Sequence, residues 1–455
     1  MNILVFSPVK IYPVDAGSRV RIYNFTSHLI KLGHNVHFVY YSADGVDKTH
    51  FDFMQNMCDS FTCIVKKKKT ELKEGNYILD QWYEDSIEKK INELVNLFKI
   101  DTVLTNYIFH SKFLESLPKN VYKIIDTHDR FTNRYKLFSN QKDVKYTWHS
   151  YSKEDEAKAL NRADMVIAIT NEENEYFSSI SKSAIVTLGH IENQKYLNRS
   201  YNTLTKIGFI GGPNQVNRVA INNFLEEFYK NSKNIDNLQI LIAGRICNHI
   251  EHQHKNIKKL DLVDDLEQFY SSVDLIINPL MFGTGQKIKS IEALSFGLPI
   301  ISTKVGFEGI SNSEKLHQLD SIADMVKTID DIVEEPLILE TLKNKSQDIF
   351  DNYTKDIKSK LKDIFKTQTE NSVEKEILIQ YQLKTQKELD DILIKSYQAK
   401  IKKQNNIIKT QKNIANKHEA ILKEIKEITK ISFFKHPIKK YKQYKNILKV
   451  YYGKY

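Results

Sequence analysis

Basic side chains lie at three places where the sequence predicts that a helix begins directly after a β-strand. They are Arg19 and Arg21 after Gly17, Arg218 after a Gly-Gly pair, and Lys287 and Lys289 after a glycine-containing loop. A helix N-terminus carries a partial positive charge, so cations in its first turn destabilise the helix by up to about 1 kcal/mol. Free backbone N–H groups, glycine and adjacent cations together form a phosphate site. Any one of these side chains could equally extend into solvent, but the repetition favours bound anions.

A carboxylate lies one helical turn beyond the last of these cations. If a helix runs from about Lys287 to Phe296, then Lys289 and Glu292 share one face at i, i+3 spacing. Glu292 could accept two hydrogen bonds from a ribose diol whose diphosphate sits at the helix start, as acidic residues do in dinucleotide sites. The alternative is an exposed Lys–Glu pair worth about 0.3 kcal/mol. The spacing therefore predicts a site suited to a nucleoside diphosphate.

These loops need a scaffold that brings several strand ends together. Short β-rich runs alternate with longer amphipathic stretches before residue 170 and again after residue 206. The runs are ILVF, VHFVYY, TVLT, YKII and MVIAI in the first half, and IGFI, LQILIAG, DLIINP and LPIIST in the second. This alternation is typical of parallel sheets built from βαβ units. We expect an α/β chain with two Rossmann-like, doubly wound domains, 1–195 and 203–365, whose strand ends face a ligand-binding cleft.

The sequence around Glu292 resembles a known family. The run GTGQKIKSIEALSFGLPII, with IGFIGGPNQVNRVAINNFL and LQILIAG before it, is similar to the donor-binding half of the two-Rossmann-domain (GT-B) glycosyltransferases. The closest resemblance is to the retaining family-four, or group 1, transferases. In the N-terminal half, SPVKIYPVDAGSRVR, KLGHNVHFV, IIDTHD and NRADMVIAITNEE look like the acceptor domain of that family. The resemblance covers roughly residues 1–365.

The resemblance implies that a sugar passes from a nucleoside diphosphate-sugar to an acceptor hydroxyl, with no bound metal and no further cofactor. Glu292 would hold the donor ribose, Arg218 is a second diphosphate candidate, and His128 matches the family's histidine that faces the cleft. The diphosphate or the sugar would meet Gly283, Thr284, Gly285, Gln286, Lys287 and Lys289. The corresponding loop of the acceptor domain carries Gly17, Arg19 and Arg21. Cations and N–H dipoles aimed at a leaving diphosphate lower the barrier to its departure.

One position departs from the family's pattern. Many members carry a glutamate eight residues before the second glutamate, where it contacts the donor sugar, and this chain has Thr284 there. The identity of the sugar therefore does not carry over, and the stereochemical outcome is less secure. An inverting reaction would need a general base near the acceptor, for which His128 and Asp129 are the nearest candidates. A structural imidazole bonded to the backbone is an equally good interpretation of His128.

The resemblance further implies a transferase that acts on a glycan or lipid-linked acceptor in bacterial cell-surface polysaccharide or glycoconjugate synthesis. A sugar-nucleotide epimerase of the same fold and a non-catalytic sugar-nucleotide-binding scaffold are the alternatives. A dehydrogenase is disfavoured because no GxGxxG follows the first strand. The three cysteines lack paired spacing, which predicts a reduced cytosolic chain without structural zinc or disulfides.

The formal net charge of +10 is unevenly distributed along the chain. Residues 366–455 contain 21 lysines and 9 acidic residues, a net of +12, and the remainder has a net charge of −2. Lysines outnumber arginines 59 to 8, which weakens any interpretation that needs bidentate guanidinium contacts to base edges. Nucleic acid is therefore disfavoured as a partner.

The last third of the chain lacks helix breakers. No glycine occurs between residues 310 and 452, which predicts a helical extension over 366–430. Within 373–428, Ile394, Ile401 and Ile408 recur every seven residues, a pattern for self-association, although the companion positions of a coiled coil are mostly polar. Residues 431–455 hold seven lysines, seven aromatic residues and no acid, which suits an anionic membrane surface. We expect a cytoplasmic protein without a membrane-spanning helix or signal peptide, peripherally associated with the inner face of the membrane.

Overall fold

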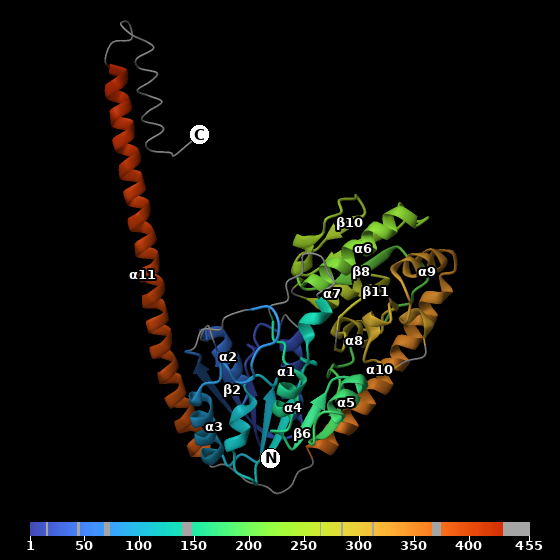
Figure 1. Cartoon of the computed structure of the whole chain (residues 1–455). Coiled ribbons are helices and arrows are strands. Elements are labelled where there is room, and N and C mark those ends of the chain that lie inside the picture. The colour runs from blue at the N-terminus through green and yellow to red at the C-terminus, as the bar shows by residue number, and fades with distance from the viewer. Residues whose placement is uncertain are drawn as a thin grey trace. The chain divides into compact units, whose positions relative to one another are not determined.

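The computed structural model describes residues 1–14, 17–42, 46–67, 73–138, 148–263, 265–283, 285–311, 314–365 and 375–430. The chain divides into two compact units, Met1–Thr385 and Gln386–Tyr455. The first unit contains two parallel β-sheets with their helices, and the described part of the second is helical (Figure 1).

The N-terminal sheet has seven parallel strands in the order β3-β2-β1-β4-β5-β6-β7. The strands are β1 (Asn2–Ser7), β2 (Asn35–Ser42), β3 (Ser60–Val65), β4 (Thr102–Asn106), β5 (Tyr122–Asp126), β6 (Met165–Ala168) and β7 (Ala184–Thr187). The helices are α1 (Gly17–Lys31), α2 (Lys48–Met57), α3 (Asp85–Leu97), α4 (Lys153–Leu160) and α5 (Asn171–Ser178), with 3-10 helices at Ser111–Ser116 and Arg134–Phe138. The order of the strands reverses at β1, where Ile3 lies opposite Val36 of β2 and Thr102 of β4. Such a switch point opens a crevice at the carboxyl ends of the strands.

The second sheet has five parallel strands in the order β10-β9-β8-β11-β12. The strands are β8 (Lys206–Ile210), β9 (Gln239–Ala243), β10 (Ile257–Lys259), β11 (Leu275–Asn278) and β12 (Ile300–Ser302). The helices are α6 (Gln215–Asn231), α7 (Leu266–Ser271), α8 (Ile288–Ser295) and α9 (Ile322–Glu334), with 3-10 helices at Arg245–His249, Val305–Phe307 and Lys315–His317. Here the order reverses between β8 and β11, so the loops before α6 and α8 lie at the crevice.

Buried apolar strands and capped helices explain why these segments fold as they do. All six residues of β1 are buried, which suits a strand covered by helices on both faces. Asn214 begins α6, since its side chain accepts a hydrogen bond from the Asn217 N–H. The α/β fold with two doubly wound halves is confirmed. The predicted domain limits at 195, 203 and 365 stay predictions.

Helix α10 (Leu337–Ile364) joins the two sheet-containing halves of the first unit (Figure 1). It packs beside α8 and α9, and Phe365 at its end contacts Phe25 of α1 with ring centroids 5.9 Å apart. Helix α11 (Lys375–Lys430) follows, and the Tyr381 hydroxyl near its start lies 2.6 Å from the Thr62 hydroxyl of β3. Among the described residues, none of the helices has the length and apolar character of a membrane span.

Candidate active site

A pocket of about 230 Å³ opens beyond the carboxyl ends of β4, β5 and β6, beside the starts of α1 and α8. Its walls are Gly17, Ser18, Arg21, Tyr107, His128, Asp129, Phe131, Arg134, Trp148, Ile169, His190, Gly285, Gln286 and Ile288. The two helix starts approach closely at Gly17, where a Cβ atom would lie 2.8 Å from the Ile288 Cδ1 atom. Residues from both sheet-containing halves therefore share one pocket.

The predicted site residues separate into two groups. Gly17, Arg21, His128, Asp129, Gly285 and Gln286 line the pocket. Arg218, Gly283, Lys287, Lys289 and Glu292 lie along the starts of α6 and α8 instead, and a Cβ atom on Gly283 would be 3.7 Å from Val216 of α6. Thr284 lies outside the described residues. The structure thus places a pocket at the carboxyl ends of the N-terminal strands and a pair of helix starts, those of α6 and α8, beside it.

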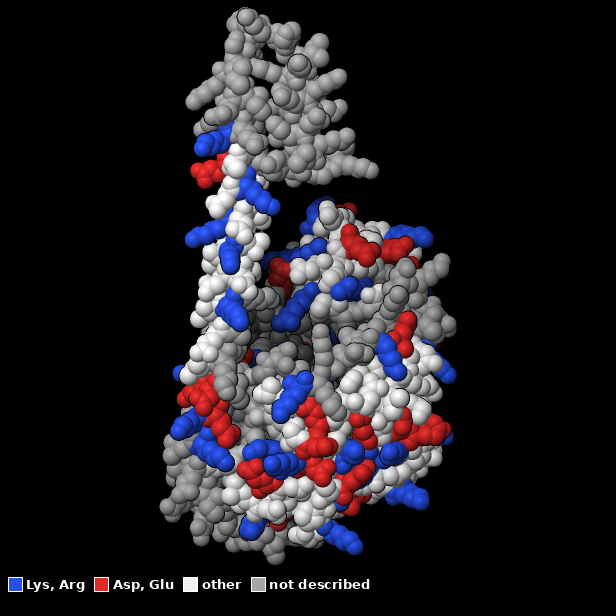
Figure 2. Space-filling model, turned by 60° about the vertical axis from the view of Figure 1, so that its left-hand side comes forward, with Lys and Arg blue, Asp and Glu red and all other residues white. Residues whose placement is uncertain are grey.

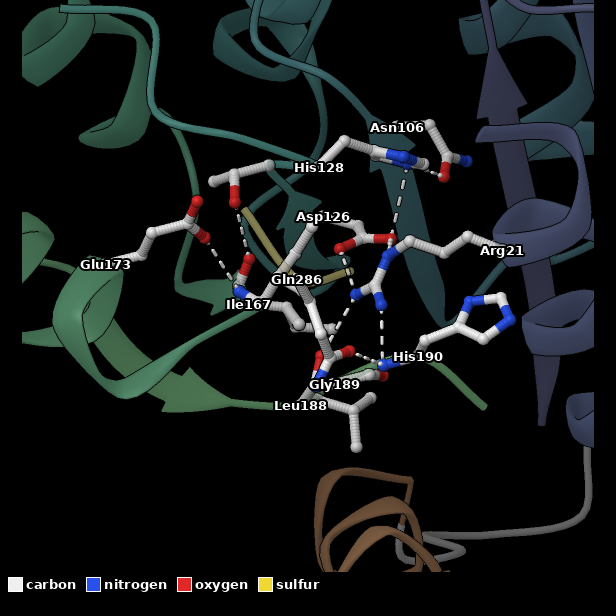
Figure 3. A network of polar contacts seen from close by, with 12 residues as sticks. Arg21, Asn106, Asp126, His128, Ile167, Glu173, Leu188, Gly189, His190 and Gln286 are labelled. Atoms are coloured by element: carbon white, nitrogen blue, oxygen red, sulfur yellow. Dashed lines mark hydrogen bonds and ion pairs between the residues drawn. The ribbon is translucent and has the colours of Figure 1, made fainter. Parts of the chain in front are cut away.

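The Arg21 side chain is buried and makes four hydrogen bonds (Figure 3). Its Nε and Nη2 atoms donate to the two carboxylate oxygens of Asp126 at 2.8 and 2.6 Å. It also donates to the Gly189 carbonyl at 3.0 Å and the Leu188 carbonyl at 3.1 Å. The guanidinium therefore ties α1 to the end of β5 and to the segment after β7. An anion-binding role for Arg21 stays a prediction, beside this structural role.

His128 is held rigidly in the wall of the pocket. Its backbone has φ 63°, a left-handed conformation that is uncommon for residues other than glycine. The ring stacks on Tyr107 with centroids 4.1 Å apart, and Nε2 lies 2.8 Å from Asn106 Oδ1 and 3.3 Å from Asp126 Oδ2. Burial lowers the pKa of His128 to about 4, so the imidazole is neutral at pH 7. Because both neighbours of Nε2 accept hydrogen bonds, the proton belongs on Nε2, and Nδ1 is left as an acceptor.

Asp129 lies where the N-terminal half of the pocket meets the loop before α8. Its carboxylate forms an ion pair with Arg134 and accepts a hydrogen bond from the Arg130 N–H at 2.9 Å. Gly285 faces the same carboxylate, since a Cβ atom there would lie 3.7 Å from Asp129 Cγ. Gly285 has φ 72°, a backbone conformation that glycine adopts without strain. The Asp129–Arg134 pair gives this side of the pocket both a hydrogen-bond acceptor and a donor.

Gln286 positions the loop rather than reaching freely into the pocket. Its Oε1 atom accepts hydrogen bonds from the His190 N–H at 2.5 Å and the Tyr353 hydroxyl at 3.2 Å. Its Nε2 atom donates to the Gly309 carbonyl at 2.7 Å. The Gln286 side-chain amide therefore holds the loop before α8 to three neighbours: the segment after β7, helix α10 and the loop after β12.

The two lysines of this region have different surroundings. Lys287 is buried and donates to the Gly285 carbonyl at 2.6 Å and to Glu308 at 3.0 Å, so a carboxylate compensates its charge. Lys289 donates to the neutral Asn217 side chain at 2.5 Å and lies 4.5 Å from the centre of the Phe209 ring. Burial lowers the pKa of Lys289 to about 7. A cation in these surroundings gains more than an exposed one from an arriving anion.

Glu292 lies one turn further along α8, as the sequence predicts. Its Oε2 atom accepts a hydrogen bond from the buried Tyr270 hydroxyl at 2.7 Å, and burial raises the pKa of its carboxyl group. Tyr270 holds the carboxylate in one orientation and leaves the other oxygen for a ligand hydroxyl.

The remaining predicted arginines have ordinary backbone partners. Arg218 donates to the Pro213 carbonyl at 2.7 Å and lies 3.0 Å from His249 Nε2. Arg19 donates to the Pro13 carbonyl at 3.1 Å. Both are partly exposed at helix starts, and their roles as anion ligands stay predictions.

Sequence reasoning missed the polar residues that hold the pocket. Asp126 and Asn106 end neighbouring strands and meet at His128, which only the pairing of β4 with β5 determines. Glu173 accepts a hydrogen bond from the Ile169 N–H at 3.0 Å, and burial, followed by the charge of Asp129, raises the pKa of its carboxyl group (Figure 3). The one available signal for Glu173 was its spacing from Thr170, which caps α5.

No group of three or more histidine, cysteine, aspartate or glutamate side chains with metal-binding geometry occurs among the residues described here.

Comparisons with known proteins address both the segment around Glu292 and the whole fold. Residues 205–335 match a family model described as glycosyl transferases group 1. A search of curated protein sequences found no match. Solved structures with the same fold include sucrose-phosphate synthase from Thermosynechococcus elongatus, at TM-score 0.57 and 15% identity over 80% of this chain and 99% of that one.

Two further structures were solved with ligands. A mutant of TarM from S. aureus, in complex with fondaparinux, alpha-GlcNAc-glycerol and UDP, has TM-score 0.61 and 11% identity over 81% of this chain and 100% of its own. HepE from Anabaena, in complex with UDP and glucose, has TM-score 0.55 and 12% identity over 80% and 100%. Identities this low establish the fold alone. Residues 205–335 therefore match the group 1 glycosyltransferase model, and the chain has the two-Rossmann-domain GT-B fold.

Proposed function

We propose that this chain transfers a sugar from a nucleoside diphosphate-sugar to a hydroxyl group of a glycan or lipid-linked acceptor. The observation that carries the proposal is the position of Lys289. Its ammonium group lies at the start of α8, bonds to a neutral amide of α6, and has a lowered pKa because of burial. Two helix starts and a cation without a bonded carboxylate among the described residues suit a diphosphate.

The same geometry suggests how the reaction would proceed. Lys289 and the free N–H groups at the starts of α6 and α8 would stabilise the charge that develops on the leaving diphosphate. Glu292 would orient the donor through its ribose hydroxyls. His128, neutral and with Nδ1 available, would accept a hydrogen bond from a sugar or acceptor hydroxyl. We further propose that the reaction retains the anomeric configuration and needs no metal ion, because protein cations and helix dipoles would supply the positive charge.

Binding of UDP is the first test of this function, because UDP accompanies TarM and HepE in their solved complexes. Titration calorimetry should give saturable binding in EDTA-containing buffer. Lys289→Ala and Glu292→Ala should each weaken binding about tenfold or more, as expected for a lost charge-assisted hydrogen bond of roughly 1.4 kcal/mol or more. Wild-type affinity for UDP in both variants would contradict the assignment of Lys289 and Glu292 to the donor site. Release of UDP from a UDP-sugar that depends on added acceptor then tests transfer itself.

The biological setting belongs to this proposal as well. We propose that the protein acts in bacterial surface-glycan synthesis, in the cytoplasm at the membrane, with residues 431–455 contacting anionic lipid. Those residues lie outside the described part of the chain.

In the described part of α11, Ile394, Ile401 and Ile408 are about half exposed, with exposed fractions of 55%, 55% and 50%. Self-association along this stripe predicts a smaller sedimentation mass for Ile401→Lys than for the wild type.

A further inference from the structure

We propose that Trp148 is a platform for a pyranose ring of the acceptor, which makes the acceptor a sugar with an apolar ring face rather than an acyclic polyol. The inference deepens the proposed transferase function and rests on it. Trp148 lines the pocket together with His128, Asp129 and Arg134, yet half of its surface, 50%, is exposed. An indole offers a large apolar face, and at a pocket that also holds polar groups it is suited to pack against the apolar face of an otherwise polar ligand.

The indole has a defined orientation. Its plane is perpendicular to the rings of His149 and Phe109, at 85° and 86°, with centroids 4.9 and 6.3 Å away. Those two rings stack on each other at 3.7 Å, and Phe109 stacks on Tyr107 at 4.8 Å. Tyr107 in turn stacks on His128. A continuous column of rings therefore fixes Trp148 relative to His128, so a ring placed on the indole would present its hydroxyls at a set position.

The neighbouring polar groups favour a carbohydrate over an acyl chain. The Asp129–Arg134 ion pair lies in the same pocket, with side chains 12% and 18% exposed. An acyl chain would remove water from this pair without replacing its hydrogen bonds, which is costly. A pyranose places its C–H face on an aromatic ring and directs its hydroxyls outward, where a carboxylate and a guanidinium can bond them.

The nucleotide of the donor is a less suitable occupant of this platform. The groups proposed to hold the diphosphate and ribose, Lys289 and Glu292, are absent from the lining of the pocket that contains Trp148. They lie on α8, and their hydrogen-bond partners Asn217 and Tyr270 lie on α6 and α7. Trp148 is therefore assigned to the acceptor.

The chain has two tryptophans, which allows a direct optical test without donor or turnover. Trp82 packs against Tyr77 and His149 and does not line the pocket, so Trp82→Phe leaves Trp148 as the single emitter. The probes are methyl glycosides of glucose, galactose, mannose and N-acetylglucosamine, with ribitol and glycerol as acyclic controls. At least one pyranoside should protect Trp148 from acrylamide quenching, with saturation and about a twofold fall in the quenching constant, and the acyclic polyols should not. Equal responses to pyranosides and ribitol, or no response to any pyranoside, overturns the proposal.

Substitution of the platform supplies the second arm. Saturation-transfer NMR with the best pyranoside should show about a tenfold loss of affinity in Trp148→Ala, and a smaller loss in Trp148→Phe because a ring remains. UDP affinity should be unchanged in both variants. Loss of UDP affinity together with pyranoside affinity in both variants assigns Trp148 a structural role and overturns the platform. If wild-type protein binds pyranosides but neither UDP nor any other nucleoside diphosphate, the proposed transferase function fails, and Trp148 is left as a pyranose-binding residue without an acceptor role.

Discussion

Lys289 is the site residue whose charge depends most on its surroundings. Burial lowers its pKa to about 7, so the ammonium group titrates near neutral pH when no anion is bound. A bound diphosphate would favour the charged form and raise this pKa. Above the pKa that Lys289 has in the free protein, binding of the diphosphate should therefore be accompanied by uptake of a proton by Lys289.

This linkage predicts a pH-dependent affinity for UDP. Terminal phosphates titrate near pH 6, so above pH 7 the ligand is constant and the protein accounts for any change. UDP affinity should be highest below pH 7 and fall by up to about tenfold per pH unit between about pH 7.5 and 9. Lys289→Arg should bind with little pH dependence over that range, since a guanidinium keeps its charge. An equally steep profile in Lys289→Arg would assign the proton to another group.

Arg21 and Arg19 provide a matched pair for separating stability from binding. Arg21 is buried against Asp126, whereas Arg19 is partly exposed. Removing one partner of a buried ion pair costs about 3–5 kcal/mol, because the other charge is left uncompensated. We expect Arg21→Ala to lower the free energy of unfolding by about that amount and Arg19→Ala by less than about 1 kcal/mol, as urea denaturation can measure. Unchanged stability with lost UDP binding in Arg21→Ala would instead favour the anion-binding role.

Residue types and spacing predict only part of the site. Lys289 and Glu292 lie on one helix, so their relation follows from the helical period, and the sequence suffices for it. Arg21 and Asp126 are 105 residues apart and meet only because β5 and α1 border the same crevice. The sequence alone does not distinguish an arginine at a helix start that binds a phosphate from one that is paired with a buried carboxylate.

At the scale of elements, the glycine loops decide how closely the strands and helices approach the ligand site. Gly244, after β9, has φ 93°, and a Cβ atom there would lie 2.4 Å from the Gly211 carbonyl oxygen. Gly212, before α6, has no heavy atom within 4 Å of the corresponding position. Gly244 is therefore required by packing, while Gly212 leaves open space at the start of α6.

Alanine at Gly244 should lower the stability of the protein, whereas alanine at Gly212 should lower its affinity for UDP. Gly244→Ala should destabilise the protein by roughly 1–3 kcal/mol through backbone strain and the clash with Gly211. Gly212→Ala should change the free energy of unfolding by less than about 0.5 kcal/mol, yet weaken UDP binding if the diphosphate approaches this backbone. Chemical denaturation and calorimetry on the same two variants measure both effects. Wild-type UDP affinity in Gly212→Ala would remove this loop from the donor site.

The elements themselves follow largely from the sequence pattern. The runs ILVF, VHFVYY and IGFI lie within β1, β2 and β8, and the central residues of LPIIST form β12. Short apolar runs between turn residues are typical of strands that are buried on both faces of a parallel sheet. Strands β3, β7 and β10 were not among the predicted runs. Strand β10 lies at a sheet edge and has two exposed lysines, so its short polar sequence lacks a burial signal. The strand order and the path of α10 depend on tertiary packing that no local pattern encodes.

At the scale of the whole molecule, the distribution of charge separates the site from the C-terminal tail. On the face of the sheet-containing unit in Figure 2, basic and acidic side chains are interspersed. This agrees with the net charge of −2 outside residues 366–455. The cations of the proposed donor site would therefore act locally, and the last 90 residues, with their net charge of +12, are the predicted source of any long-range attraction to anionic surfaces.

The membrane prediction belongs to this scale, because it concerns a segment that should not be needed for the proposed binding of UDP. The full chain should bind phosphatidylcholine vesicles that contain phosphatidylglycerol, and a chain ending at Lys430 should not. The seven lysines of residues 431–455 contribute up to about 1 kcal/mol each near an anionic surface, so binding should weaken as salt screens them. Neutral vesicles are the control for the lipid, and unchanged UDP affinity is the control for the shortened chain.

If the shortened chain binds anionic vesicles as well as the full chain does, the tail is not the anchor. The eleven lysines between residues 386 and 430 would then be the next cations to replace, because they lie outside the unit that contains the site.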